Sequence, residues 1–304
     1  MTLRPLLTGD TIAFVTPASP LDSVKLDAMT ELLTSWGYLV KVFPHAFKRD
    51  AYLAGTDAER ATDLMAAFND DSVAAVMCNR GGYGCARLLE YLDLDRMAET
   101  RKMLLGFSDV TTLQLALLSR GLPSVYAPMP LTLNTTREPW VYQSLRQVLT
   151  GNLNIPTDAP RGVTVVPGSA EGMVTGGCLC LIGDSIGTSH SINAEGRIVI
   201  IEDVDENPHR VDAMLTHLRN AGIIQQAAGI VVGEMTGTDE RVDAGIGGKP
   251  WREIFRDRLG GLGIPMITDY PFGHAKNMLT LPMGIRARLD ADMGTLTYLE
   301  SLCS

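Results

Sequence analysis

The sequence predicts an α/β fold with a mainly parallel sheet in its first half. Short apolar runs typical of strands alternate there with stretches whose apolar residues recur at helical spacing. Such alternation favours a parallel sheet with helices on both faces. The chain has 304 residues, 45% of them hydrophobic and 20% charged, which is enough for two domains of ordinary globular composition.

The first half contains four clear strand–helix pairs. Strands are expected at 11–15, 38–43, 73–78 and 103–107, and helices at 26–36, 58–68, 87–92 and 110–119. Parallel sheets of this kind bind ligands at the carboxyl ends of their strands. The loop after Cys78 and the residue Ser108 both lie at such ends, so this edge is the expected site.

A change of composition after Thr150 indicates a second domain. The segment 151–172 is rich in Gly, Pro, Asn and Thr and predicts a linker and the entry to that domain. We therefore divide the chain into a first α/β domain (1–150), the linker (151–172) and a second domain (173–304). The second domain is expected to contain more β structure than the first. Its expected elements are strands at 198–201 and 230–232, helices at 208–219 and 251–259, and short strands after 280.

Charge and cysteine content exclude several classes of protein. The net charge of −9 argues against a nucleic-acid partner, because phosphate binding requires an excess of Lys and Arg. No apolar run reaches the roughly 18 residues of a membrane span, and no signal peptide precedes the first strand, which favours the cytoplasm.

An odd number of cysteines without framework spacing indicates reduced thiols. Cys178 and Cys180 could be a metal pair, but no Cys or His lies nearby, so buried apolar roles are favoured and no metal or cofactor is expected.

Ser108 is the most informative single residue. It separates a buried strand from an amphipathic helix and so lies on a tight turn, beside the N–H groups of the helix start. An acyl-transfer enzyme places its nucleophile and oxyanion donors at such a junction. The alternative is a plain helix N-cap, for which Ser is equally suited.

The glycine-rich loop 79–84 follows the strand that ends at Cys78. Its glycines allow backbone N–H groups to face a ligand, but the loop lacks both the dinucleotide-binding and the P-loop patterns. A simple turn is one interpretation. A second oxyanion donor beside Ser108 is the other.

Glu202 and His274 are candidate partners for a serine nucleophile. Glu202 ends an apolar strand, where a carboxylate can orient an imidazole, and His274 follows Gly273 in a loop, where it could act as a base. A solvated acidic loop and a turn-capping histidine are the alternatives. Spacing alone does not show that the three residues meet.

Several motifs taken together resemble the LD-carboxypeptidase family of serine peptidases, which includes muramoyltetrapeptide carboxypeptidases and microcin C self-immunity hydrolases. The motifs are Ala-Phe-Val-Thr-Pro-Ala-Ser (13–19), Arg-Gly-Gly-Tyr-Gly (80–84), Gly-Phe-Ser-Asp-Val-Thr (106–111), Ile-Glu-Asp (201–203), Arg-Val-Asp (210–212), Phe-Gly-His (272–274) and Thr-Leu-Pro-Met-Gly (280–284). They occur in the family's order and cover nearly the whole chain.

The resemblance implies a Ser-His-Glu triad. Ser108 would be the nucleophile, His274 the base and Glu202 its orienting carboxylate, with the N–H groups of Gly82 and Asp109 as the oxyanion hole. It also implies a first domain similar to class I glutamine amidotransferases, a swivelling second domain that carries the Glu and His, a homodimer and no metal. The implied reaction releases D-Ala from the L-centre of the diamino acid in a murein tetrapeptide, during cytoplasmic wall recycling.

One position departs from the family pattern. Where the family usually has Gly-Gly-Asn-Leu, this chain has Cys178, which cannot supply the hydrogen bonds of an amide. Arg80, Tyr83 and Cys178 are the candidate substrate contacts. Altered specificity is therefore open, with an immunity-type hydrolase of aminoacyl nucleotides as one alternative and a non-catalytic small-molecule binder as another.

Overall fold

A computed structural model describes residues 2–246 and 248–303 and divides them into two compact units. The first unit runs to Leu153 and also includes Thr280–Gly284 and the end of the chain from Ser301. The second consists of Asn154–Leu279 and Ile285–Glu300. Within the described residues, no helix has the length and apolarity that crossing a bilayer requires.

The first unit is a six-stranded sheet in the order β11-β5-β4-β3-β1-β2. Its strands are β1 (Thr11–Val15), β2 (Leu39–Val42), β3 (Val73–Cys78), β4 (Met103–Gly106), β5 (Ser124–Tyr126) and β11 (Leu281–Met283). All neighbours pair in parallel except β11, which runs antiparallel to β5. The predicted α/β class and parallel sheet are therefore confirmed.

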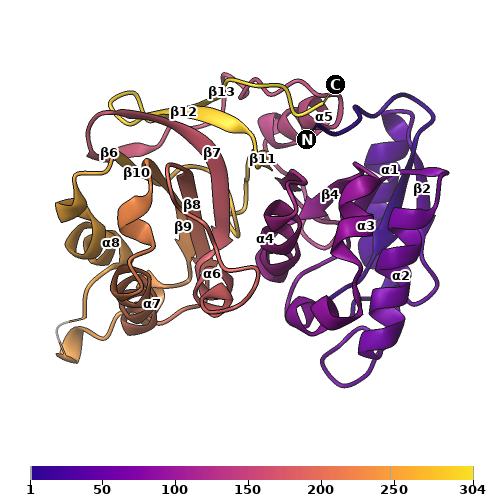
Figure 1. The fold of residues 1–304 in the computed structure, drawn as a ribbon, viewed down its shortest axis with the longest axis horizontal. Coiled ribbons are helices and arrows are strands. Elements are labelled where there is room, and N and C mark those ends of the chain that lie inside the picture. The colour runs from indigo at the N-terminus through magenta and orange to yellow at the C-terminus, as the bar shows by residue number, and fades with distance from the viewer. Residues whose placement is uncertain (1, 247, 304) are drawn as a thin grey trace. The chain divides into compact units, whose positions relative to one another are not determined.

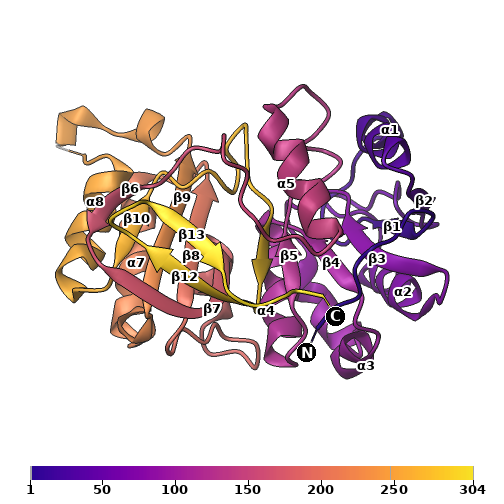
Figure 2. The same cartoon turned by 90° about the horizontal axis from the view of Figure 1, so that it is seen from above.

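Helices cover both faces of this sheet. They are α1 (Asp27–Ser35), α2 (Asp57–Asn69), α3 (Leu94–Glu99), α4 (Thr111–Ser119) and α5 (Pro139–Leu149), with 3₁₀ turns η1 (Ser23–Leu26), η2 (Cys85–Tyr91) and η3 (Ser108–Val110). Figure 2 shows α1 and α5 on one face and α2, α3 and α4 on the other. The helix predicted at 87–92 is the 3₁₀ turn η2, and α5 was not predicted.

The second unit is a seven-stranded sheet in the order β13-β12-β7-β8-β9-β10-β6. Its strands are β6 (Val163–Val166), β7 (Ser169–Cys178), β8 (Ile198–Val204), β9 (Gly229–Thr236), β10 (Met266–Thr268), β12 (Arg286–Asp290) and β13 (Thr295–Tyr298). The central strands β7 to β10 are parallel, and β6, β12 and β13 are antiparallel additions.

The described residues of the second unit form three α-helices, and α7 contacts both of the others (Figure 1). They are α6 (Leu179–Ser185), α7 (Pro208–Asn220) and α8 (Trp251–Leu259), and the 3₁₀ turns are η4 (Ile224–Gln226), η5 (Asp239–Arg241), η6 (Ala244–Ile246) and η7 (Gly260–Leu262).

Two segments differ from the expected division of the chain. The expected linker 151–172 contains β6 and the start of β7, and Leu281–Met283 pairs with β5 in the first sheet rather than within the second domain. The physical reason is that both segments form strands by pairing with residues far away in sequence, β6 with β10 and β11 with β5. The local composition of a segment does not reveal such a partner.

Candidate functional site

Ser108 lies on a sharp turn between β4 and α4. Its φ angle is +64°, in the left-handed region that residues with a Cβ rarely adopt, whereas Phe107 before it is extended with φ −153°. A strained strand-to-helix turn is the backbone form that presents the nucleophilic serine in many acyl-transfer enzymes. Because β3 and β4 are parallel neighbours, the loop after Cys78 emerges at the same edge.

The glycine-rich loop packs directly against Ser108. A Cβ atom on Gly81 would lie 2.8 Å from the Cβ of Ser108, 3.0 Å from its Oγ and 3.2 Å from the backbone N of Asp109. Only glycine permits this approach. The structure therefore brings Gly81, Ser108 and Asp109 together within the first unit, whereas Gly82 was the loop residue named as an oxyanion donor.

Ser19 holds the other side of the same loop. Its Oγ accepts a hydrogen bond from the backbone N–H of Tyr83 at 3.2 Å. Gly82 has φ +112°, and a Cβ on it would lie 2.3 Å from the Ser19 Oγ. The carboxylate of Asp109 is buried and accepts a hydrogen bond from the N–H of Cys85 at 2.8 Å, which fixes the end of the loop.

Arg60 is a positioning residue that the sequence did not reveal. Its side chain on α2 is fully buried and donates hydrogen bonds to the carbonyl oxygens of Pro17, Gly84 and Gly55, and it pairs with Asp57. The guanidinium thus ties the loops after β1 and β3 to α2. A charged residue in an amphipathic helix is normally taken as solvent-facing, so only its burial shows this role.

Arg80 and Tyr83, two of the substrate-contact candidates, have different surroundings. Arg80 donates to the carbonyl oxygens of Pro20 at 2.9 Å and Gly81 at 3.1 Å, and burial lowers the pKa of its guanidinium. Tyr83 is half exposed, and its ring centroid lies 5.8 Å from that of Tyr52. Arg80 therefore braces its own loop, while Tyr83 offers an accessible ring.

Glu202 and His274 form a hydrogen-bonded pair in the second unit. The ring Nδ1 of His274 lies 2.7 Å from Oε2 of Glu202, and the backbone N–H of His274 donates to the same oxygen at 3.0 Å. Because a carboxylate only accepts, Nδ1 carries the hydrogen and Nε2 is left as the basic nitrogen. Glu202 is completely buried at the end of β8, so its charge is held beside the imidazole.

The pKa of His274 reflects two opposing effects. Burial lowers it, but the charge of Glu202 and its hydrogen bond, with smaller contributions from Asp203 and Asp205, outweigh burial and raise the pKa of His274 above its usual value. The pair is therefore suited to stabilising an imidazolium that forms during a reaction.

Cys178 does not present its thiol to solvent. It is 2% exposed, and its Sγ lies 3.4 Å from the Sγ of Cys180 and 3.3 Å from Oδ1 of Asp203. The hydrogen bond with Cys180 and burial raise the pKa of the Cys178 thiol well above its usual range. This burial differs from the expected role of Cys178 as a substrate contact.

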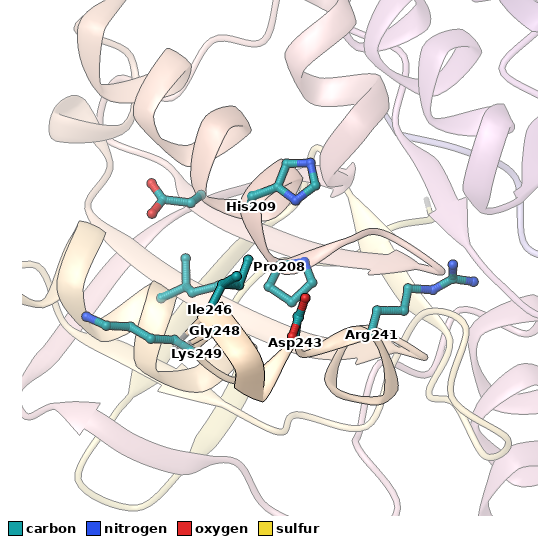
Figure 3. A pocket seen from close by; sticks show the side chains of 9 residues that line it. Pro208, His209, Arg241, Asp243, Ile246, Gly248 and Lys249 are labelled. Carbon is teal, nitrogen blue, oxygen red and sulfur yellow. The ribbon is translucent and has the colours of Figure 1, made fainter.

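A separate pocket of about 280 Å³ lies at the start of α7. Figure 3 shows Pro208 and His209 on one side of it and Ile246, Gly248 and Lys249 on another. None of the predicted catalytic residues is among the described residues that line it. It is a surface feature of the second unit with charges of both signs.

Comparison with known proteins identifies related sequences over nearly the whole chain. The LD-carboxypeptidase N-terminal domain profile matches residues 12–127, and the LD-carboxypeptidase C-terminal domain profile matches residues 171–289. A Streptomyces coelicolor protein with the provisional name of a carboxypeptidase is 38% identical over 98% of this chain and 96% of that protein. The murein tetrapeptide carboxypeptidase of Pseudomonas aeruginosa is 30% identical over 92% of this chain and 93% of that protein.

Solved structures share the fold. The crystal structure of muramoyltetrapeptide carboxypeptidase from Oxalobacter formigenes superposes with a TM-score of 0.82 at 28% identity, covering 95% of this chain and 97% of that one. The microcin C7 self-immunity protein in complex with glutamyl sulfamoyl guanosine reaches a TM-score of 0.88 over 100% of this chain and 99% of that one, but at 23% identity this likeness concerns the fold alone. The two profiles and the full-length relatives show that the chain belongs to the LD-carboxypeptidase family of peptide hydrolases.

Proposed function

We propose that this protein is a serine LD-carboxypeptidase that releases terminal D-Ala from murein tetrapeptides. The observation that carries the proposal is the Glu202–His274 pair, in which a buried carboxylate fixes the tautomer of an imidazole. The strained turn at Ser108 supports it with a candidate nucleophile. The substrate class is supported by the names of the P. aeruginosa and O. formigenes relatives.

In the proposed mechanism the first unit supplies Ser108 and the second supplies the His–Glu pair. The Oγ of Ser108 attacks the carbonyl carbon of the scissile amide, and Nε2 of His274 takes its proton. The N–H groups of Gly82 and Asp109 stabilise the oxyanion, each contributing roughly 3 kcal/mol to the transition state. His274 then protonates the departing amine of D-Ala, and a water molecule hydrolyses the ester by the reverse proton transfers.

The cytoplasmic location and the homodimer that the family resemblance implies belong to the same proposal. Cell fractionation tests the first, and light scattering of the purified chain tests the second.

Product analysis by mass spectrometry tests the proposed reaction. The intact protein should convert a murein tetrapeptide into tripeptide and D-Ala, and Ser108→Ala should abolish the conversion. Ser119→Ala is the matched control, because its hydroxyl only donates to the carbonyl of Ala116 at the end of α4. Unchanged hydrolysis by Ser108→Ala would refute the nucleophile.

A double-mutant comparison tests whether Ser108 and His274 act together. When two residues belong to one triad, the losses of activity caused by replacing each of them are not additive. The double variant Ser108→Ala/His274→Ala should therefore be no slower than either single variant. Additive losses would mean that the two residues serve separate functions.

The competing substrate class can be measured in the same assay. Trp251 is fully buried, with its ring edge-on to Phe255 at 5.8 Å, so it is not placed to stack a nucleobase. We therefore expect the tetrapeptide to be hydrolysed faster than glutamyl sulfamoyl guanosine. The reverse preference would assign an immunity-type hydrolase, and binding without turnover of either compound would assign a non-catalytic binder.

A further inference from the structure

Three ligand-type side chains converge at the end of two neighbouring strands in the second unit. Cys178 ends β7, Cys180 lies in the first turn of α6, and Asp203 lies on β8, which pairs in parallel with β7. Their ligand atoms all lie within 4.8 Å of one another. The sequence showed the two cysteines but not the carboxylate, which comes from a strand that begins 18 residues after Cys180, at Ile198.

The distances match one face of a tetrahedral metal site. The two sulfurs are 3.4 Å apart, and Oδ1 of Asp203 lies 3.3 Å from the Cys178 sulfur and 3.8 Å from the Cys180 sulfur. With Zn–S near 2.3 Å and Zn–O near 2.0 Å, tetrahedral coordination places two sulfurs about 3.8 Å apart and a sulfur and an oxygen about 3.5 Å apart. Each of the three observed distances is within about 0.4 Å of the distance expected for tetrahedral coordination. The three side chains would therefore need to move only slightly to bind an ion.

The carboxylate is held in place by the backbone. Its Oδ2 accepts a hydrogen bond from the N–H of Cys180 and its Oδ1 accepts one from the N–H of Val204, both at 2.8 Å. Cys178 and Asp203 are each 2% exposed. Such outer contacts orient the ligands of metal sites and restrict their motion.

An ion can reach the cluster from solvent. Cys180 is the partly exposed member, and it also lines a pocket of about 250 Å³ with Asp184, Arg210 and His217. The pocket leaves room for a fourth ligand, either solvent or a side chain that moves toward it.

We propose that Cys178, Cys180 and Asp203 form a binding site for one thiophilic divalent cation, of which Zn²⁺ is the representative. Two thiolates and a carboxylate are a ligand set that favours Zn²⁺ over Mg²⁺ or Ca²⁺. Binding exchanges the two thiol protons, which go to solvent, for two metal–sulfur bonds, with no change of oxidation state. The metal proposal does not rest on the proposed peptide hydrolysis, because none of the three side chains reacts in that mechanism and Asp203 makes only a smaller contribution to the raised pKa of His274.

Titration of the full-length, reduced protein with Co²⁺ and Zn²⁺ under anaerobic conditions tests the site. We expect one ion per chain, proton release on binding, a sulfur-to-cobalt charge-transfer band, and the intense visible bands of tetrahedral Co²⁺ that Zn²⁺ then displaces. Cys180→Ser should weaken binding by more than about 100-fold, because even outer contacts of a metal site typically contribute 10- to 100-fold.

Cys303→Ser is the matched control, because it removes a buried thiol of the first unit and should leave the titration unchanged. Circular dichroism of Cys180→Ser and Asp203→Asn verifies that loss of binding is not loss of fold. The proposal is overturned if the wild type shows no charge-transfer band, if Cys180→Ser binds as tightly as the wild type, or if thiol titration finds Cys178 and Cys180 joined as a disulfide. Peptidase activity is measured separately, so a failure here leaves the proposed function untouched.

Discussion

Gly273 lies so close to Glu202 that a Cβ atom on residue 273 would be 2.3 Å from Oε2. The same glycine has φ +90°. Because Oε2 of Glu202 accepts from both the ring and the backbone N–H of His274, the carboxylate has to occupy the space beside residue 273. The Glu–His pair therefore depends on a glycine immediately before the histidine.

We expect Gly273→Ala to inactivate the enzyme without unfolding it. The methyl group would push Glu202 away and misalign the imidazole, and a misplacement of about 1 Å can reduce catalysis roughly 100-fold. Gly187→Ala is the control for backbone strain alone, since Gly187 has φ +85° but open space around its Cβ position. Steady-state kinetics should show a loss in kcat for Gly273→Ala only, and equal activity of the two variants would contradict the steric argument.

Ser108 should store backbone strain that glycine would relieve. A residue with a Cβ at φ +64° costs about 1 kcal/mol, so Ser108→Gly should be more stable than Ser108→Ala by about that amount. Both variants lack the hydroxyl and should be inactive. Denaturant unfolding measures the difference, and a less stable Ser108→Gly would mean that the turn is not strained.

The raised pKa of His274 predicts how activity depends on pH. A general base must be neutral, so kcat/KM should rise with pH through a value above the ordinary histidine pKa of about 6.5. Glu202→Gln removes the dominant charge that raises this pKa. The acid limb of the profile should then move to lower pH, while the maximal rate falls steeply because the tautomer is no longer fixed. An unmoved acid limb would exclude His274 as the titrating group.

The same shift predicts an effect on stability. A histidine whose pKa is higher in the folded state stabilises the fold fully below its unfolded pKa, near 6.5, and this contribution is lost as pH rises through the folded pKa. The free energy of unfolding of the wild type should therefore decline as pH rises above about 6.5, and it should decline more than that of Glu202→Gln. If the free energies of unfolding of the wild type and Glu202→Gln depended on pH in the same way, the Glu202–His274 pair would not be the cause of the raised pKa.

Helices and strands could be predicted from the sequence where their own residues show an apolar run or an apolar periodicity. The strands at 11–15 and 73–78 match β1 and β3 because each is a short apolar run, and the helix at 251–259 matches α8 because its apolar residues recur at helical spacing. β7 was not predicted because its glycines interrupt any β-branched run. The strand β8 requires a glycine at position 176, since a Cβ on Gly176 would lie 2.1 Å from the carbonyl oxygen of Ile200 on β8.

Site residues were predictable one at a time but not as contacts. Glu202 and His274 are 72 positions apart, and their hydrogen bond depends on β8 and the loop after β10 lying together in the second unit. The meeting of Ser108 with this pair stays a prediction. Arg60 and Asp203 were missed because a charged side chain gives no sign of burial in a single sequence.

Replacing Arg60 tests whether its buried guanidinium holds the loops after β1 and β3 in position. Arg60→Met would leave the carbonyl oxygens of Pro17 and Gly84 without their buried donor, and it would break the ion pair with Asp57. Leaving buried partners unpaired costs about 2–4 kcal/mol, and the loosened loop should lower kcat/KM at least about tenfold.

Arg87→Met is the matched control, because Arg87 pairs with the same Asp57 at 2.6 Å from a side chain that is 43% exposed. A surface pair of this kind contributes at most about 1 kcal/mol, so Arg87→Met should keep nearly full activity and stability. Denaturant unfolding and steady-state kinetics on both variants separate the two roles. If Arg60→Met were no worse than Arg87→Met, the buried guanidinium would not be what holds the loops after β1 and β3.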